Sequence, residues 1–430
     1  MAGRGLLIAG TASRTGKTTV ALGISRALSR RGVNVMAAKS GPDYIDPAFH
    51  AAASGNPCVN LDGWAMSDGR LSSLADTQDL LIVEGAMGLF DGAPPDGLGS
   101  SAQLAKRLGL GVVLVVDATS MSQSVAAIVN GFAAHDPDCP IAGVILNNVA
   151  TPRHEAMLCK ALAQTSTPVI GSVRRDRQLT RPSRHLGLVQ ASEDPDIASF
   201  LDLAAERVSE GIDLDLLVSL AKPLANDTHA APAGLPALGR HIAIARDQAF
   251  AFLYSHQIID WRASGATISY FSPLADETPH PEADAVYLPG GYPELHGQTL
   301  ARAGHFRQSL VQAAARGVKI YGECGGFMVL GQSIADRRGV SFPMVGLLGL
   351  ETSFEAPRLH LGYRKLTAVA GPWSGSRFAG HEFHYATVTR NEGTPLFDGH
   401  DATGRDLGPI GLVQGSVSGS FAHIIDLDMT

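Results

Sequence analysis

A glycine-rich turn between a short apolar run and a helical repeat constrains the fold of this chain more than any other feature. Residues 6–9 are apolar and long enough for one buried strand, and the stretch Gly-Thr-Ala-Ser-Arg-Thr-Gly-Lys-Thr-Thr follows at 10–19. Apolar side chains then recur at helical spacing as far as Leu28, and residues 33–38 form a second apolar run. This order predicts a β-α-β unit with a phosphate-binding loop at its first corner.

The residue types in this loop suit a polyphosphate. Backbone N–H groups and the helix N-terminus that follows them attract an anion. A lysine neutralises the terminal phosphates, and the hydroxyl after it binds Mg²⁺. We therefore expect ATP at this loop, with Lys17 on phosphate and Thr18 on the metal. The predicted ATP-binding residues in the loop are Gly10, Thr15, Gly16, Lys17, Thr18 and Thr19.

Acidic residues follow the next apolar runs, where strand ends approach a nucleotide. Mg²⁺ is a hard ion that prefers carboxylate and phosphate oxygens. Glu84 closes one apolar run, and Asp43 and Asp46 follow another. We predict that Thr18, Asp46 and Glu84 hold Mg²⁺, and the alternative for such acids is that they are caps or surface residues. Lys39 ends its own strand, where its charge would steady a transferring phosphoryl group.

A second glycine-rich turn has the sequence Gly-Glu-Cys-Gly-Gly at residues 322–326 and follows the predicted strand 318–321. We call it the elbow, because a strand-to-helix corner of this kind holds a nucleophile on a strained turn. We predict that Cys324 attacks a carbonyl carbon, and the alternative is a small buried side chain. A thiol nucleophile needs a base, and His423 provides one. The predicted oxyanion and elbow residues are Gly290, Gly291 and Gly325.

Length and patterning predict two domains. A chain of 430 residues is too long for one compact core. Continuous apolar runs such as 110–117 and 141–148 alternate with helical stretches, which indicates a doubly wound α/β domain. A stretch rich in Pro and Ala without periodicity then predicts a linker. The predicted boundaries are a domain with the phosphate-binding loop at 1–225, a linker at 226–238 and a domain with the elbow at 239–430.

Charge and cysteine content exclude several classes of protein. A net charge of −7 argues against a general nucleic-acid or membrane binder, and no apolar stretch is long enough to span a bilayer. The four cysteines are widely spaced and match neither a zinc site nor a disulfide framework. We therefore expect a cytoplasmic protein with small-molecule substrates, and we leave a homodimer open.

The motifs of the whole chain together resemble the glutamine-hydrolysing cobyrinic acid and hydrogenobyrinic acid a,c-diamide synthases. Leu-Pro-Gly-Gly-Tyr-Pro-Glu-Leu at 288–295, the elbow, and Ser-Phe-Ala-His at 420–423 look like the glutaminase domain of that family. Further matching motifs lie, in the order of the family, at 39–47, 83–92, 184–188, 361–364 and 380–385. The resemblance implies a dethiobiotin-synthetase-like P-loop domain, followed by a class I glutamine amidotransferase-like α/β domain.

The same resemblance implies a reaction. Glutamine would be hydrolysed at Cys324 through a thioester, releasing ammonia. ATP would phosphorylate a carboxylate of a corrinoid, and ammonia would displace the phosphate, first at the c and then at the a acetate side chain. The likeness to dethiobiotin synthetase also implies that Asn147 contacts adenine, with a tight-turn role as the alternative.

The resemblance also implies a site for the acceptor. The segment 43–46 combines carboxylates with Tyr44 and Ile45, a composition suited to a planar apolar ring beside a metal. Basic residues of the C-terminal half, Arg364 and His381, are expected to bind the acceptor's carboxylates. The alternative is that they belong to an ordinary solvated strand. The predicted acceptor or phosphoryl site consists of Lys39, Asp43, Tyr44, Ile45, Arg364 and His381.

One departure from the family pattern and two other functions stay open. Many triad-type glutaminases carry a glutamate two residues after the catalytic histidine, but Ile425 stands there. The orienting group is therefore a backbone carbonyl, another acid, or absent. The same chemistry on nickel-sirohydrochlorin or another tetrapyrrole is one alternative function. A P-loop regulatory ATPase with an inactive glutaminase-like domain is the other, and the intact Cys324 and His423 argue against it.

Overall fold

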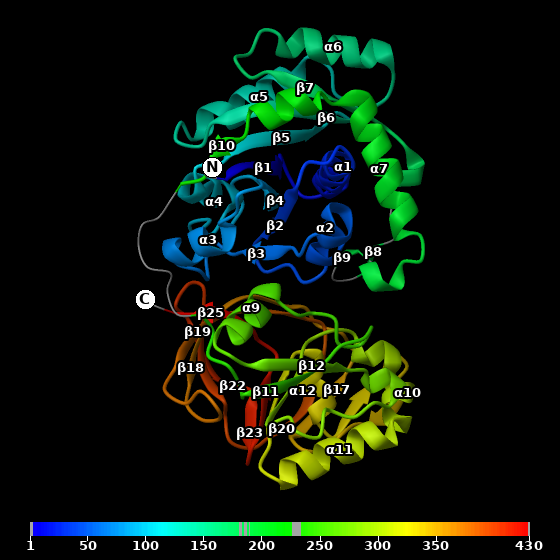
Figure 1. The fold of residues 1–430 in the computed structure, drawn as a ribbon, viewed down its shortest axis with the longest axis vertical. Helices are drawn as coiled ribbons and strands as arrows, with labels where there is room; N and C mark the ends of the chain where they lie inside the picture. Colours follow the sequence, from blue (N-terminus) through cyan, green and yellow to red (C-terminus); the bar gives the residue numbers. More distant parts are fainter. Residues whose placement is uncertain (1–2, 180–182, 185–186, 189, 226–233, 429–430) are drawn as a thin grey trace. The chain divides into compact units, whose positions relative to one another are not determined.

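The computed structural model describes residues 3–179, 183–184, 187–188, 190–225 and 234–428 (Figure 1). The chain divides into two compact units, residues 1–232 and 233–430. Most of the predicted linker, at 226–233, lies outside the described residues, as do residues 185–186 of the motif at 184–188. In the described part of the chain, no helix is both long and apolar enough to cross a membrane.

The first unit is built on a parallel sheet with the strand order β3-β2-β4-β1-β5-β6-β7. The chain runs from β1 to one side and later returns to build the other side, so the carboxyl ends of β4, β1 and β5 form a switch point where ligands bind in such sheets. Its strands are β1 (Arg4–Gly10), β2 (Val35–Ser40), β3 (Val59–Leu61), β4 (Leu80–Gly88), β5 (Gly111–Asp117), β6 (Ile141–Val149), β7 (Val169–Arg174) and β10 (Lys222–Pro223), which pairs antiparallel with β1.

Helices cover this sheet on its two faces (Figure 1). They are α1 (Lys17–Arg30), α2 (Asp46–Ser54), α3 (Asp68–Ala75), α4 (Ser101–Leu108), α5 (Ser124–His135), α6 (Pro152–Leu162), α7 (Ile197–Gly211) and α8 (Leu214–Ser219). Short elements are the 3-10 turns η1 (Arg177–Leu179) and η2 (Ala191–Glu193) and the paired strands β8 (Ser183–Arg184) and β9 (Gly187–Leu188).

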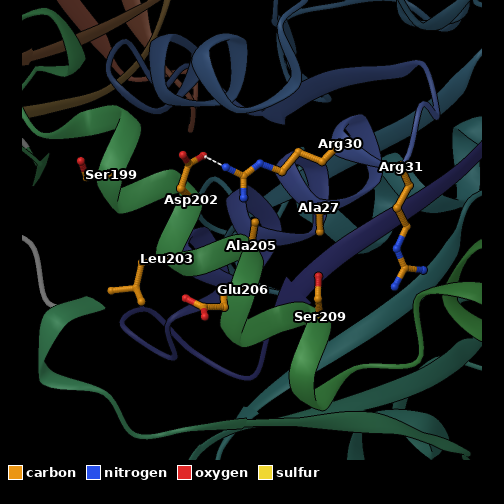
Figure 2. A pocket seen from close by; sticks show the side chains of 9 residues that line it. All are labelled: Ala27, Arg30, Arg31, Ser199, Asp202, Leu203, Ala205, Glu206 and Ser209. Carbon is orange, nitrogen blue, oxygen red and sulfur yellow. Dashed lines mark ion pairs between the residues drawn. The ribbon is translucent and has the colours of Figure 1, made fainter.

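Helix α1, which begins at the phosphate-binding loop, packs closely on α7. A Cβ at Gly23 would lie 2.7 Å from the carbonyl oxygen of Ala204 and 2.7 Å from Val208, so a glycine permits this approach. On the surface between the two helices lies an open hollow of about 590 Å³ (Figure 2). Arg30 pairs with Asp202 there at 2.6 Å. The contact with α7 holds α1, and with it the loop, against the sheet.

The second unit contains a six-stranded sheet with the order β12-β11-β13-β14-β24-β23, parallel except for β23. Apolar cores lie against it, one around Phe250 and Phe306 and one around Trp261 and Phe378. The strands are β11 (His241–Ala245), β12 (Thr267–Phe271), β13 (Ala285–Leu288), β14 (Lys319–Glu323), β23 (Leu412–Gln414) and β24 (Val417–Ser420).

Two smaller sheets and several helices complete the second unit. A four-stranded sheet contains β15 (Ser333–Ala335), β16 (Ser341–Pro343), β17 (Gly349–Ser353) and β20 (Thr387–Glu392). A five-stranded antiparallel sheet contains β18 (His360–Ala368), β19 (Arg377–His384), β21 (Phe397–Asp401), β22 (Asp406–Ile410) and β25 (His423–Leu427). The helical elements are α9 (Ser255–Ala263), η3 (Pro273–Ala275), η4 (Pro293–His296), α10 (Gly297–Arg302), α11 (Gly304–Ala315) and α12 (Gly325–Leu330).

The predicted fold class is confirmed, since a doubly wound P-loop unit precedes a second α/β unit. One strand differs from its prediction. Glu84 does not end its strand, because β4 continues to Gly88 and Glu84 lies within it. Glu84 is there the register partner of Lys39 on β2 and of Ile8 on β1. The carboxylate thus lies at the centre of the sheet, between the phosphate-binding loop and Lys39.

Candidate nucleotide and glutaminase sites

The phosphate-binding loop joins β1 to α1 through a glycine in the left-handed region. Gly16 has φ +81°, and a Cβ there would lie 2.1 Å from the side-chain nitrogen of Asn147. That nitrogen donates a hydrogen bond to the carbonyl oxygen of Thr15 at 2.8 Å. Asn147, on β6, therefore supports the loop through this hydrogen bond. Its predicted contact with adenine stays a prediction. Helix α1 begins at Lys17, so its N-terminus faces the loop and favours an anion.

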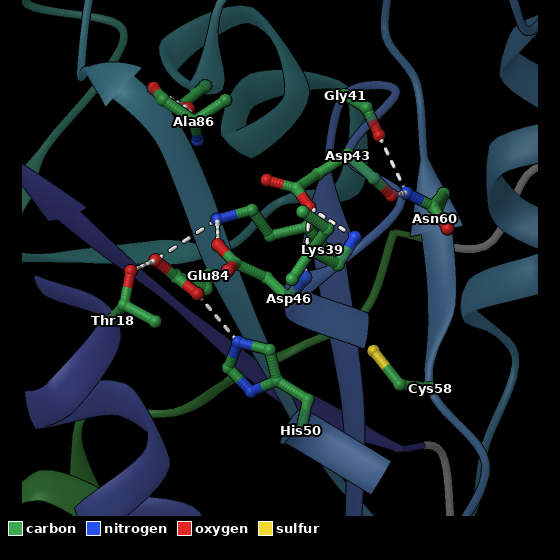
Figure 3. Close-up of polar contacts among 12 residues, drawn as sticks. Thr18, Lys39, Gly41, Asp43, Asp46, His50, Cys58, Asn60, Glu84 and Ala86 are labelled. Atoms are coloured by element: carbon green, nitrogen blue, oxygen red, sulfur yellow. Dashed lines mark hydrogen bonds and ion pairs between the residues drawn. The ribbon is translucent and has the colours of Figure 1, made fainter. Parts of the chain in front are cut away.

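Thr18, Lys39 and His50 contact the carboxylate of Glu84, and Lys39 also contacts Asp46; we call these five residues the Glu84 cluster (Figure 3). The hydroxyl of Thr18 donates to Glu84 Oε1 at 2.5 Å, and His50 Nε2 lies 2.6 Å from Oε2. The ammonium of Lys39 lies 3.1 Å from Glu84 Oε1 and 2.6 Å from Asp46 Oδ2. Glu84 and His50 are fully buried. The cluster thus combines a fixed cation with hard oxygen ligands directly behind the loop.

Burial and the neighbouring charges set the protonation states in this cluster. Burial would raise the pKa of Glu84, but Lys39 and His50 hold it below its usual range, so the carboxylate is ionised. Burial would lower the pKa of Lys39, but Asp46 and Glu84 raise it above its usual range. Burial, and next the charge of Asp43, raise the pKa of Asp46 to about 6. Burial lowers the pKa of Lys17.

The predicted acceptor segment is held by polar contacts to its backbone (Figure 3). Asp43 Oδ1 accepts hydrogen bonds from the backbone N–H groups of Ile45 and Asp46, at 2.8 and 2.9 Å. Asn60 Nδ2, on β3, donates to the carbonyl oxygens of Gly41 and Asp43, at 2.9 and 2.8 Å. Asp43 therefore holds the turn that leads into α2, and the sequence interpretation missed both Asn60 and His50. A polar residue within an apolar strand was the available signal for Asn60.

The elbow places Cys324 on a strained backbone between β14 and α12. Cys324 has φ +47° and ψ −104°, a conformation that costs energy for a residue with a side chain. Its N–H donates to the carbonyl oxygen of Ser420 at 2.8 Å. A Cβ at Gly326 would lie 1.9 Å from the carbonyl oxygen of Leu288, so this corner requires glycine. Burial, and next the charge of Glu294, hold the pKa of the Cys324 thiol above its usual range, so a thiolate needs a proton acceptor nearby.

The predicted oxyanion residues surround the sulfur-bearing residue. The N–H of Gly325 hydrogen-bonds the Cys324 sulfur and opposes the rise in its pKa. The nitrogen of Gly291 lies 2.9 Å from the position that a Cβ of Gly325 would take. The N–H of Gly326 donates a hydrogen bond to the carbonyl oxygen of Pro289 at 3.1 Å. The amides of Gly291 and Gly325 thus lie close together beside the nucleophile.

His423, the first residue of β25, lies next to Cys324 although the two are far apart in sequence. A Cβ at Gly290 would lie 2.3 Å from His423 Cε1, 2.8 Å from Nε2 and 3.3 Å from the Cβ of Cys324. Burial, and next the charge of His381, lower the pKa of His423 to about 3. The imidazole is therefore neutral near pH 7 and able to accept a proton.

An acid that the sequence interpretation did not assign lies on the other side of His423. Glu323 Oε2 is 3.6 Å from His423 Nδ1. The hydroxyls of Tyr287 and Tyr321 donate to this carboxylate at 2.6 and 3.2 Å, and the N–H of Ile424 donates at 3.0 Å. Burial raises the pKa of Glu323 to about 7, and these three donors oppose the rise. A glutamate at the end of the strand 319–323, directly before the nucleophile, was the available sequence signal.

Arg364 and His381 lie in the second unit, whereas Lys39, Asp43, Tyr44 and Ile45 lie in the first. The guanidinium Nε of Arg364 contacts Glu382 Oε2 at 2.7 Å, and His384 Nε2 lies 2.8 Å from Glu382 Oε1. His381 is the register partner of His423 in the β19–β25 pair. Burial, and next the charge of Arg364, lower the pKa of His381 to about 3. His381 thus lies on the strand next to that of the candidate base, and Arg364 lies on β18, one strand further away.

Replacing Gly290 with alanine is expected to reduce glutamine hydrolysis by about 100-fold or more. The added Cβ would overlap His423 and displace its ring, and a misplacement of about 1 Å costs a reaction that much. Glutamate release measures the effect. Gly304→Ala is the control, because a Cβ there meets nothing within 4 Å. Full glutaminase activity in Gly290→Ala would show that the His423 ring is not confined there during catalysis.

Comparisons with known proteins agree with this division into two sites. Residues 6–189 match the CobQ/CobB/MinD/ParA nucleotide binding domain, and residues 241–428 match the CobB/CobQ-like glutamine amidotransferase domain. A solved glutamine amidotransferase aligns with 42% of this chain and 89% of its own at 16% identity, with a TM-score of 0.29, and no assignment rests on that likeness.

Curated relatives match the chain over nearly its full length. Proteins from Brucella suis and Rhizobium meliloti are 55% and 51% identical, each over 98% of this chain, and cover 98% and 99% of their own length. A Rhodobacter capsulatus protein is 49% identical over 98% of both chains. All three are named hydrogenobyrinate a,c-diamide synthase. The chain therefore belongs to the hydrogenobyrinate a,c-diamide synthase family.

Proposed function

We propose that this protein is a carbon–nitrogen ligase that amidates the a and c acetate side chains of hydrogenobyrinic acid, with ATP and glutamine as co-substrates. The observation that carries the proposal is the presence of two complementary sites in one chain. One is a phosphate-binding loop backed by the buried Glu84 cluster, and the other is a cysteine elbow with a neutral histidine beside it. The relatives' name supplies the acceptor and favours the metal-free macrocycle over cobyrinic acid.

The geometry of the elbow supports the proposed glutaminase half-reaction. His423 Nε2 takes the thiol proton of Cys324, and the sulfur attacks the side-chain carbonyl carbon of glutamine. The N–H groups of Gly291 and Gly325 stabilise the oxyanion that forms. His423 returns the proton to the leaving nitrogen, and ammonia departs as the C–N bond breaks. Water then hydrolyses the thioester and releases glutamate and the free thiol.

The synthetase half-reaction uses the first unit. An oxygen of the acceptor carboxylate attacks the terminal phosphorus of ATP, and ADP leaves, which converts the carboxylate to an acyl phosphate. Ammonia then forms a bond to the acyl carbon, phosphate departs, and the nitrogen loses a proton to give the amide. Lys17 and Lys39 offset the charge of the transferring phosphoryl group. We propose that Gly10, Thr15, Gly16 and Thr19 cradle the phosphates and that Asn147 supports the loop.

The Glu84 cluster fits a magnesium ion. Thr18, Asp46 and Glu84 offer a hydroxyl and two carboxylates, the hard oxygen ligands that Mg²⁺ takes together with phosphate oxygens. Thr18 and Glu84 are already within hydrogen-bonding distance, and Lys39 bridges Glu84 and Asp46. When bound, the ion neutralises negative charge on the terminal phosphates. We therefore propose these three residues as its protein ligands.

The proposed function is tested by supplying candidate acceptors separately. The purified protein is incubated with ATP, Mg²⁺, glutamine and either hydrogenobyrinic acid, cobyrinic acid or nickel-sirohydrochlorin, and the macrocycle is weighed by mass spectrometry. We expect the diamide of hydrogenobyrinic acid. A diamide formed only from nickel-sirohydrochlorin would change the acceptor and keep the chemistry. ATP hydrolysis with no amide from any acceptor would favour the regulatory ATPase.

Replacing Tyr44 with alanine is expected to raise the ratio of monoamide to diamide product several-fold, with little change in ATP affinity. The ring lies in the segment that Asp43 and Asn60 hold beside the Glu84 cluster, where the proposal places the acceptor. Product ratios by mass spectrometry and ATP binding by calorimetry measure the two effects. Tyr44→Phe is the control, because it keeps the ring and removes the hydroxyl. An unchanged ratio with weakened ATP binding would assign Tyr44 to the nucleotide instead.

The remaining proposals concern the acceptor residues, the oligomeric state and the location of the protein. We propose that Lys39, Asp43 and Ile45 act on the acceptor in the first unit, and that Arg364 and His381 bind carboxylates in the second unit. We further propose a homodimer in the cytoplasm, which sedimentation analysis and cell fractionation test. The proposed binding partners of the protein are the small molecules ATP, glutamine and the macrocycle.

A further inference from the structure

We infer that Glu323 is the residue that positions His423 for glutamine hydrolysis, in place of an acid two residues after the histidine. The inference rests on the proposed glutaminase function and assigns a third member to its site. Glu323 directly precedes the nucleophile in the chain, so one strand end carries both groups. The usual position for the acid is occupied by Ile425, which is fully buried and apolar.

The position of His423 between two groups is the first argument. Its Nε2 end faces the elbow, because Nε2 and Cε1 surround the point where a Cβ of Gly290 would lie, next to Cys324. Its Nδ1 lies 3.6 Å from Glu323 Oε2, and the two side chains are each 1% exposed. A carboxylate on Nδ1 favours the tautomer with the proton there, which leaves Nε2 free to take the thiol proton. The separation is compatible with a hydrogen bond that tightens when the imidazolium forms.

The rigidity of the carboxylate is the second argument. Three donors on three different strands hold it: Tyr287 on β13, Tyr321 on β14 and the backbone of Ile424 on β25. The two tyrosine rings stack at 5.9 Å, and Trp261 and Trp373 pack edge-on against them at 5.5 and 4.9 Å. A group that orients another must itself be fixed by packing and hydrogen bonds.

The charge balance is the third argument. A buried ionised carboxylate is costly unless it is paired or hydrogen-bonded, and a glutamine would satisfy the same tyrosines without that cost. An imidazolium formed during catalysis would, however, be stabilised more by a negative charge than by a neutral acceptor. The other titratable groups that act on His423 are on β19: His381 and His384 oppose its protonation, and Glu382 favours it. Glu323 thus supplies negative charge at Nδ1, on the side away from the nucleophile.

The test is Glu323→Gln, which keeps the shape of the side chain and an acceptor for the tyrosines. We expect kcat/KM for glutamine hydrolysis to fall about 100-fold or more, since orientation and charge at the base are lost together. The pH profile gives a readout that a structural role would not move. As pH falls through about 7, Glu323 gains a proton and no longer accepts from Nδ1, so wild-type activity should fall on that acid limb. In Glu323→Gln this limb should disappear.

Tyr287→Phe provides a second variant that leaves the carboxylate in place. Removing this donor removes one of the interactions that oppose the raised pKa of Glu323. The acid limb of kcat/KM should therefore move to higher pH. Ammonia-dependent amide synthesis reports whether each variant is folded.

Each outcome decides the inference. Wild-type kcat/KM and an unchanged acid limb in Glu323→Gln would overturn it. If Glu323→Gln loses ammonia-dependent synthesis through misfolding, the pH profile of Tyr287→Phe is the test instead. An acid limb at the same pH as in the wild type would then overturn the inference. A wild-type protein that releases no glutamate from glutamine at all would instead refute the proposed function, so the two failures are distinguishable.

Discussion

Replacing Cys324 with alanine is expected to abolish glutamine-dependent amide synthesis, by about 10⁴-fold or more, while ammonia-dependent synthesis persists. Removing the nucleophile of a covalent mechanism leaves only binding and oxyanion stabilisation. Ammonia supplied directly replaces the product of the elbow, and the residues proposed for phosphoryl transfer all lie in the first unit. The measurement is amide formation with each nitrogen donor, with ammonium at high concentration and mildly alkaline pH, where more of it is unprotonated.

The control for this variant is Cys159→Ala, on α6 of the first unit and partly exposed. The Cys159→Ala protein should make the amide with both nitrogen donors, because the Cys159 thiol lies in neither candidate site. A Cys324→Ala protein that still uses glutamine would refute the thioester. A folded Cys324→Ala protein that fails with ammonia would show that the elbow takes part in the synthetase half-reaction. No amide from either donor in the wild type would favour the regulatory ATPase.

Replacing Lys17 with alanine is expected to reduce amide synthesis with either nitrogen donor by about 10³-fold or more, while glutamine hydrolysis persists. Phosphoryl transfer depends on positioning and on charge neutralisation at the terminal phosphates, and the buried Lys17 ammonium begins the helix that faces them. Release of ADP and of glutamate, measured in the same reaction, separates the two activities. Lys160 is exposed on α6, so Lys160→Ala is the charge-matched control and should keep both amide synthesis and glutamine hydrolysis.

Glu84→Gln provides an independent test of the same site. The substitution keeps the size of the side chain and removes the negative charge that Thr18, Lys39 and His50 surround. We expect synthesis to fall as in Lys17→Ala, with half-maximal activity at a higher Mg²⁺ concentration because one proposed ligand has lost its charge. Wild-type synthesis rates in either variant would contradict the assignment of the nucleotide site.

The sequence alone was enough to predict the two local corners on which the function depends. A phosphate-binding loop and a nucleophile elbow are each built from neighbouring residues, and each needs glycines where the backbone is strained or crowded. Gly16 at φ +81° and Gly326 beside the carbonyl of Leu288 are such positions, and both were visible as glycines between a strand and a helix. The continuous apolar runs likewise predicted the buried strands β5 and β6, because both faces of a parallel sheet are covered.

Only the tertiary structure decided which polar groups meet at these corners. Glu323 and His423 are brought together by packing β14 and β25 in one unit, and His50 and Asn60 reach the Glu84 cluster and the acceptor segment from α2 and β3. Spacing along the chain contains no signal for such contacts, since they join residues of different elements. A family pattern directed attention to position 425, whereas the fold placed a buried carboxylate beside the histidine from a different strand. Local conformation follows from neighbouring residues, but hydrogen bonds across a core depend on the order and register of the strands.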